Sequence, residues 1–129
     1  MRRRFADASV AHLATASADA RPHVVPCCCV LQGSTGYTAV DAKPKTTSRL
    51  QRVRNIEENP AVSLIVDHYN DDWTQLWWVR VDGRARVVTD DDERATALDL
   101  LADKYLQYRE TRPPGPVIAI DIEHWRAWP

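Results

Sequence analysis

The segment at residues 77–87 constrains the fold of this chain more than any other feature. Its apolar side chains recur at every second position, and the positions between them carry Arg80, Asp82, Arg84 and Arg86. A period of two places successive side chains on opposite faces of a β-strand, so the segment predicts a long strand with one solvated face. Gly83 interrupts the pattern and predicts a bulge or bend, as barrels need where a strand turns a corner.

Five further segments have the length and composition of strands. They lie at residues 10–17, 23–31, 37–40, 61–66 and 117–125. The pattern also predicts amphipathic helices at residues 46–58 and 89–105, each beginning at good N-cap residues. The links between successive strands are too short for parallel crossovers. The sequence therefore predicts a mainly β fold, a six-stranded antiparallel split or closed β-barrel with two or three short helices.

Length and charge limit the classes of protein that this chain can belong to. A chain of 129 residues suits one domain, which we expect to span residues 1–129. The 17 Lys and Arg against 18 Asp and Glu give a net charge of −1, so no nucleic acid or membrane partner is expected. No apolar run approaches the roughly 20 residues of a membrane span. Cys27, Cys28 and Cys29 are consecutive, which fits no disulfide framework and favours a reducing cytoplasm.

A basic segment at residues 43–54 holds five cations and no acid. On a helical wheel Lys45, Arg49 and Arg52 lie along one edge of the apolar stripe, whereas Arg54 lies on the solvated side. The expected helix N-terminus adds backbone N–H donors beside Lys43 and these cations, and this combination favours a bound phosphate or carboxylate. The alternative is a basic helix that only faces solvent.

The sequence lacks the residue patterns that metal sites and other catalytic chemistries require. The four His are scattered without zinc-type spacing, and the acidic stretch at residues 67–72 lacks the ligand spacing of a calcium site, so no metal is predicted. Alternation places Cys27 and Cys29 on one strand face and Cys28 on the other, as small apolar residues. No phosphate loop, nucleophile elbow or acid pair is present, and no catalytic residue is assigned.

Five Trp in so short a chain predict a protein interface or a ligand wall as well as a core. Trp77 lies on the apolar face of its strand and is expected to pack. Trp78 lies on the opposite face among arginines, where a flat cofactor ring or a partner subunit would explain it. The aromatic content predicts a homodimer.

Several strings together resemble a known family. They are VDAKPK at residues 40–45, RNI at 54–56 before Asn59-Pro60, VDHY at 66–69 and LWWVR at 76–80. With them the chain resembles the pyridoxamine 5'-phosphate oxidase-like superfamily, in particular an actinobacterial group of deazaflavin (coenzyme F-420)-dependent oxidoreductases. The resemblance covers nearly the whole chain. It implies an FMN-binding split barrel of the flavin-reductase type, a homodimer with the cofactor at the interface.

The resemblance also implies which residues bind the cofactor. It implies that the basic segment binds the cofactor phosphate, through Lys43, Lys45, Arg49 and Arg52. It implies that the second strand lies beside the cofactor ring, at Pro22, His23, Val24, Val25 and Pro26. From its place among the arginines, Trp78 is also expected to form a flat wall for this ring.

The function expected from these observations is oxidoreductase chemistry. Reduced coenzyme F-420 would deliver hydride to a small conjugated or heteroaromatic acceptor, with the protein supplying binding and orientation. The alternatives are an FMN-dependent oxidase or reductase and a non-catalytic flavin or deazaflavin carrier, because phosphate-binding residues alone do not make an active site.

Overall fold

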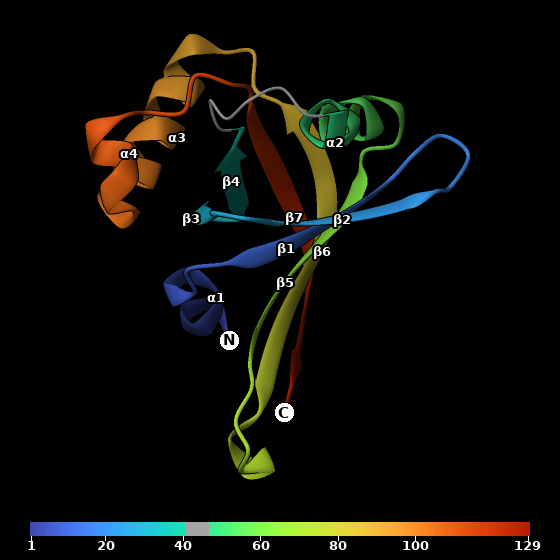
Figure 1. The fold of residues 1–129 in the computed structure, drawn as a ribbon, viewed down its shortest axis with the longest axis vertical. Coiled ribbons are helices and arrows are strands. Elements are labelled where there is room, and N and C mark those ends of the chain that lie inside the picture. Colours follow the sequence, from blue (N-terminus) through green and yellow to red (C-terminus); the bar gives the residue numbers. More distant parts are fainter. Residues whose placement is uncertain (41–46) are drawn as a thin grey trace.

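The computed structural model describes residues 1–40 and 47–129, with the backbone alone for residues 47–50. In this part of the chain seven strands form one antiparallel sheet in the order β2-β1-β5-β6-β7-β4-β3 (Figure 1). The strands are β1 (Ala11–Ala16), β2 (Pro22–Cys27), β3 (Val30–Gln32), β4 (Thr35–Ala39), β5 (Ala61–His68), β6 (Trp77–Val87) and β7 (Val117–Trp128). The helices are α1 (Arg2–Asp7), α2 (Thr47–Glu58), the 3₁₀ helix η1 (Trp73–Gln75), α3 (Asp91–Lys104) and α4 (Leu106–Glu110).

Chain connectivity makes this sheet curl. β2 and β3 lie at its opposite edges, yet only Cys28 and Cys29 separate them in the chain. Three Cα–Cα steps join Cys27 to Val30 and span at most about 11 Å, so the two edges must come together. The result is a split barrel, and the predicted mainly β, antiparallel barrel with few helices is confirmed.

The described part of the structure has seven strands where six were predicted, because the strand expected at residues 23–31 is divided into β2 and β3. At the joint the backbone N–H of Cys29 donates to the Tyr105 hydroxyl at 3.0 Å, and Lys104 Nζ donates to the Cys29 carbonyl oxygen at 2.6 Å. Burial lowers the pKa of Lys104 and raises that of Tyr105 to about 12. These two side chains from the end of α3 satisfy backbone groups that a continuous strand would pair within the sheet.

Two apolar cores lie on opposite faces of the sheet. Ile118 and Ile120 of β7 face the barrel core, whereas Val117 and Ala119 face a second core beneath α3 and α4. Cys27 and Cys29 pack on the barrel core. Cys28 packs on the second core. The predicted division of the three cysteines between two faces is therefore confirmed.

The bulge predicted at Gly83 is present. The pairing of β6 with β7 shifts register between Asp82 and Gly83. A Cβ at Gly83 would lie 2.2 Å from the backbone oxygen of Asp121, so the two strands approach too closely there for any side chain. Glycine at this position lets the long hairpin bend around the barrel.

The long hairpin of β5 and β6 extends away from α2, to the end of the molecule where η1 lies (Figure 1). Trp77, at the start of β6, is half-buried and packs against the barrel core, as its place on the apolar face predicts. Among the helices that the structure describes, none is both long enough and apolar enough to cross a membrane.

Candidate functional site

Polar side chains are buried at the end of the barrel that α2 covers. Four polar or charged residues of the described chain are buried: Thr15, Thr38, Arg52 and Asn55. Arg52 is only 9% exposed and Asn55 only 1% exposed. A spacing of three puts Arg52 and Asn55 on the same face of α2, the face turned toward the sheet.

Asn55 fixes α2 to the barrel. Its Nδ2 donates to Thr15 Oγ1 on β1 at 3.0 Å, and its Oδ1 accepts from Gln51 Nε2 at 2.7 Å. Ile56, 2% exposed, and the half-buried Val53 pack on the barrel core beside it. Polar and apolar contacts therefore hold α2 against the barrel one turn after Arg52. These contacts set the position of the Arg52 guanidinium.

The edge strand β2 divides its predicted site residues between two faces. His23 pairs with the buried Thr15, so His23 and Val25 turn toward the interior. Pro22, Val24 and Pro26 turn outward, and Val24 is 62% exposed. We use the name polar corner for the interior group formed by Thr15, His23, Thr38, Arg52 and Asn55.

The polar corner contains buried atoms that have no hydrogen-bond partner. Within the described residues these atoms are Arg52 Nε and His23 Nδ1, whereas Thr38 Oγ1 lies beside the Cys27 thiol. No carboxylate of the described chain forms an ion pair with Arg52. Buried polar groups are normally paired, and an unpaired buried cation is costly. The corner therefore fits an anionic group that also accepts and donates hydrogen bonds.

Cys27 lies at the point where β2, β4 and α2 meet. Burial raises the pKa of its thiol, while the neighbouring Thr38 side chain and the positive charge of Arg52 act in the opposite direction. The thiol stays protonated near neutral pH, so Cys27 contributes a small apolar wall to the corner and no nucleophile.

The structure brings together only some of the predicted cofactor residues. Lys43 and Lys45 lie outside the described residues, and for Arg49 only the backbone is described, in α2. Arg54 is exposed, as the helical wheel predicts. Trp78 is half-buried near the far end of β6, roughly 17 Å along the strand from Gly83. Strand pairing aligns Ala14, next to Thr15 of the polar corner, with Ser63 and then Asp82, so Trp78 lies well away from the corner within one chain.

Sequence reasoning missed Thr15, Thr38 and Asn55. Each carries a weak signal, because each is a polar residue at a position whose periodicity calls for an apolar one. Thr15 follows Leu13 on the inner face of β1, and Asn55 directly precedes the apolar residue Ile56 on α2. Among residues 1–40 and 47–129, no cluster of three or more His, Cys, Asp or Glu side chains is arranged to hold a metal ion.

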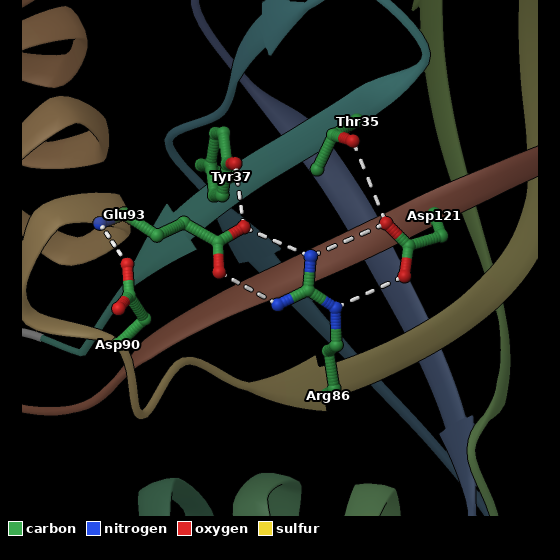
Figure 2. A network of polar contacts seen from close by, with 6 residues as sticks. All are labelled: Thr35, Tyr37, Arg86, Asp90, Glu93 and Asp121. Atoms are coloured by element: carbon green, nitrogen blue, oxygen red, sulfur yellow. Dashed lines mark hydrogen bonds and ion pairs between the residues drawn. The ribbon is translucent and has the colours of Figure 1, made fainter.

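A second polar network, around Arg86, has a structural role (Figure 2). Arg86 donates to both carboxylate oxygens of Glu93 at 2.8 Å and to Asp121 at 3.0 Å. The Tyr37 hydroxyl donates to Glu93 at 2.7 Å, and Asp90 caps the start of α3 by accepting from the Glu93 backbone N–H at 2.8 Å. The network ties α3 to β4, β6 and β7, and Arg86 lies between two of its carboxylates.

Acid should weaken this network. Hydrogen bonds from Arg86 and Tyr37 hold the pKa of Glu93 at about 2, below its ordinary value of 4.5. A lowered pKa stabilises the fold above the ordinary value, and that stability is lost as the pH falls from about 4.5 to about 2. Because the Arg86 side chain is 45% exposed, solvent screening keeps the contribution at about 1 kcal/mol.

Urea unfolding of Glu93→Gln at several pH values measures this loss. We expect the variant to be less stable than the unmodified chain at pH 6 and the difference to shrink toward pH 2. The matched control is Asp99→Asn, which removes the exposed ion pair with Arg112 and should change little at any pH. A difference for Glu93→Gln that stays constant with pH would contradict the assignment.

Comparisons with known proteins agree with this fold. A family model described as pyridoxamine 5'-phosphate oxidase matches residues 1–129. No curated protein matches the chain. A solved FAD-binding protein from Mesorhizobium loti is 23% identical, with a TM-score of 0.74, and the match covers 98% of this chain and 89% of that one.

Two solved heme proteins are also similar in fold. The heme binding protein from Mycobacterium smegmatis is 19% identical, with a TM-score of 0.78, and the match covers 98% of this chain and 51% of that one. The heme storage protein HutZ from Vibrio cholerae is 16% identical, with a TM-score of 0.70 and coverages of 93% and 84%. At such identities the structures show the fold alone, whereas the family model matches the chain from end to end. The chain belongs to the pyridoxamine 5'-phosphate oxidase family.

Proposed function

We propose that the protein is an oxidoreductase that binds a phosphorylated flavin-type cofactor, with the phosphate at the polar corner. The observation that carries the proposal is the buried Arg52, whose Nε has no partner among the described residues. One turn along the same helix, Asn55 contacts Thr15, the strand partner of His23, whose Nδ1 is also unpaired. A phosphate supplies the negative charge and the acceptor oxygens that this group lacks. When bound, the cofactor supplies two-electron hydride chemistry.

Coenzyme F-420 is the cofactor that we favour, with FMN as the alternative. Besides the exposed Arg54, the basic segment at residues 43–54 carries four cations, which is more than one phosphate needs. A deazaflavin with an oligoglutamate tail has more negative charge than FMN and would use this surplus. Lys43, Lys45 and Arg49 are proposed to bind the phosphate and the tail together with Arg52.

β2 is proposed to hold the cofactor ring. It is an edge strand, paired only with β1, so part of its backbone is free to hydrogen-bond to a ligand. Pro22 and Pro26 have no backbone N–H, and the N–H groups of a paired edge strand alternate between its neighbour and the open side. Either Val24 alone or His23 and Val25 together would therefore offer donors to a planar heterocycle. The exposed Val24 offers an apolar surface on the same strand. This assignment leaves out Trp78, because of its distance from the corner within one chain.

The solved relatives support a cofactor in this fold and suggest two kinds. The Mesorhizobium loti protein is named for FAD, and two others are named for heme. The cationic corner of this chain favours the phosphorylated flavin type, since its buried Arg52 calls for an anionic group such as a phosphate. A non-catalytic carrier of the same cofactor is the second candidate, because the described residues include no acid or base placed for catalysis.

Two experiments test the function. Titration of the purified apoprotein with F-420, FMN, FAD and heme should show the tightest binding for F-420, and a protein that binds heme alone would overturn the proposal. Stopped-flow mixing of the reduced complex with enones, quinones and linear tetrapyrroles should show reoxidation of the coenzyme. Binding without reoxidation by any acceptor would identify a carrier.

Assembly gives a further prediction. The outward side chains of β2 and the hairpin tip leave large apolar groups in solvent, among them Val24, Tyr69 and Trp73, which are 62%, 67% and 69% exposed. We propose that a homodimer covers the β2 part of this surface, leaving the hairpin tip in solvent, and that the cofactor lies at its interface. Light scattering at micromolar concentration should give about twice the 14.7 kDa chain mass. A mass near 14.7 kDa would remove the dimer and the interface placement of the cofactor.

A further inference from the structure

A second pocket lies at the far end of the long hairpin, away from the polar corner. It has a volume of about 390 Å³, within the range of small-molecule sites. Its walls include Asp67, His68, Tyr69, Trp77, Trp78 and Trp128. We call it the aromatic pocket. The fold and the cofactor proposal assign no role to it.

Strand pairing puts a carboxylate beside two indoles in this pocket. Asp67 of β5 pairs with Trp78 of β6, and Trp78 pairs with Trp128 of β7. Directly paired residues project from the same sheet face with Cβ atoms about 5 Å apart, so the three side chains form one row. No described Lys or Arg forms an ion pair with Asp67. Trp128 is 49% exposed.

The charge of the hairpin tip is negative. Between residues 67 and 79 the chain carries Asp67, Asp71 and Asp72 and neither Lys nor Arg. Arginines already lie over two of the rings from neighbouring elements: Arg80 is 6.0 Å from the Trp78 ring centroid, and Arg4 is 4.9 Å from that of Trp77. Asp82, 2.9 Å away, balances the charge of Arg80. The indole faces here are placed to attract cations, and no described cation lies over Trp128.

We propose that the aromatic pocket binds a small organic cation of the quaternary ammonium class, held by Asp67 and by the face of Trp128, beside Trp78. Aromatic faces attract such cations through their quadrupole, and the carboxylate adds Coulomb attraction. The pocket is larger than one trimethylammonium group, so it has room for the rest of a ligand. The acids of the tip would repel an anionic cofactor, which distinguishes this pocket from the basic end of the barrel.

A pair of probes that differ in charge tests the proposal. Choline and 3,3-dimethylbutan-1-ol have nearly the same shape, but only choline carries the positive charge. Titration followed by tryptophan fluorescence and by NMR of the indole N–H groups should show saturable binding of choline, at least threefold tighter than that of the neutral alcohol. Equal affinities for the two probes, or no binding of choline, would overturn the proposal.

Variants locate the site. Asp67→Asn keeps the shape of the side chain and should weaken choline binding about threefold to tenfold, and Trp128→Leu should do the same. Trp73→Leu is the matched control, because Trp73 is exposed on the same hairpin tip but does not line the pocket. Circular dichroism checks that each variant folds. Choline binding that is lost in Trp73→Leu and kept in Asp67→Asn would overturn the assignment.

Discussion

Replacing Arg52 with Ala should weaken binding of the flavin-type cofactor by about one to two powers of ten. A charged hydrogen bond to a phosphate contributes roughly 1.5–3 kcal/mol, and each 1.4 kcal/mol corresponds to a tenfold change in Kd. Arg52 is 9% exposed, so solvent screens its interaction with the ligand less than that of a surface cation. Fluorescence titration of the apoprotein with F-420 and with FMN measures the change.

Arg54→Ala is the matched control for Arg52→Ala. Both residues lie on α2 and carry the same charge, but Arg54 is exposed. Its removal should change the cofactor affinity less than about threefold, as expected for a distant charge screened by solvent. If both variants lowered the affinity equally, the general charge of the basic segment would explain binding and the polar corner would lose its role. Thermal melting of the two apoproteins shows whether either substitution disturbs the fold.

Gly83→Ala should destabilise the protein by about 3 kcal/mol, at the upper end of the usual cost of overpacking a well-packed site. The added Cβ would lie 2.2 Å from the Asp121 oxygen and 3.1 Å from Ile122 Cα. These are backbone atoms of β7, so no side-chain rotation can relieve the overlap. Either the bulge must open or the two strands must separate. A loss of this size lowers the melting temperature by about 10 °C in a domain of this length.

The control for Gly83→Ala is Gly36→Ala, also within the sheet. A Cβ at Gly36 would have Cys29 Sγ as its nearest neighbour at 3.6 Å, an ordinary contact. Gly36→Ala should therefore change the free energy of unfolding by less than about 1 kcal/mol. If Gly83→Ala were as stable as Gly36→Ala in urea unfolding, the bulge would not constrain the hairpin as described.

The strands could be predicted because their period-two patterns are local. β6 is the clearest case, since alternation and one glycine predict both the strand and its bulge. The break between β2 and β3 could not be predicted, because Cys28 and Cys29 are as apolar as their neighbours. The hydrogen bonds that stabilise the break come from Lys104 and Tyr105, more than 70 positions away in the chain. Tertiary contacts of this kind leave no periodic signal.

The candidate site could be predicted only through its charge. Arg52 belongs to the set Lys43, Lys45, Arg49 and Arg52, which a run of cations without an acid selects, and the structure places Arg52 inside the polar corner. Thr15, Thr38 and Asn55 were missed, because a single polar residue in an apolar pattern reads as an interruption. Pattern alone also treats Pro22 to Pro26 as one unit, whereas pairing with β1 separates them into an inner and an outer face.

The most direct test of the polar corner compares cofactors that differ only in the phosphate. FMN and riboflavin share the same ring, so the ratio of their Kd values isolates the phosphate contribution. The unmodified protein should bind FMN about ten to one hundred times more tightly than riboflavin, and this ratio should fall toward one in Arg52→Ala. Equal affinities for the phosphorylated and unphosphorylated forms, or a ratio that Arg52→Ala leaves unchanged, would contradict the assignment of the polar corner as the phosphate site.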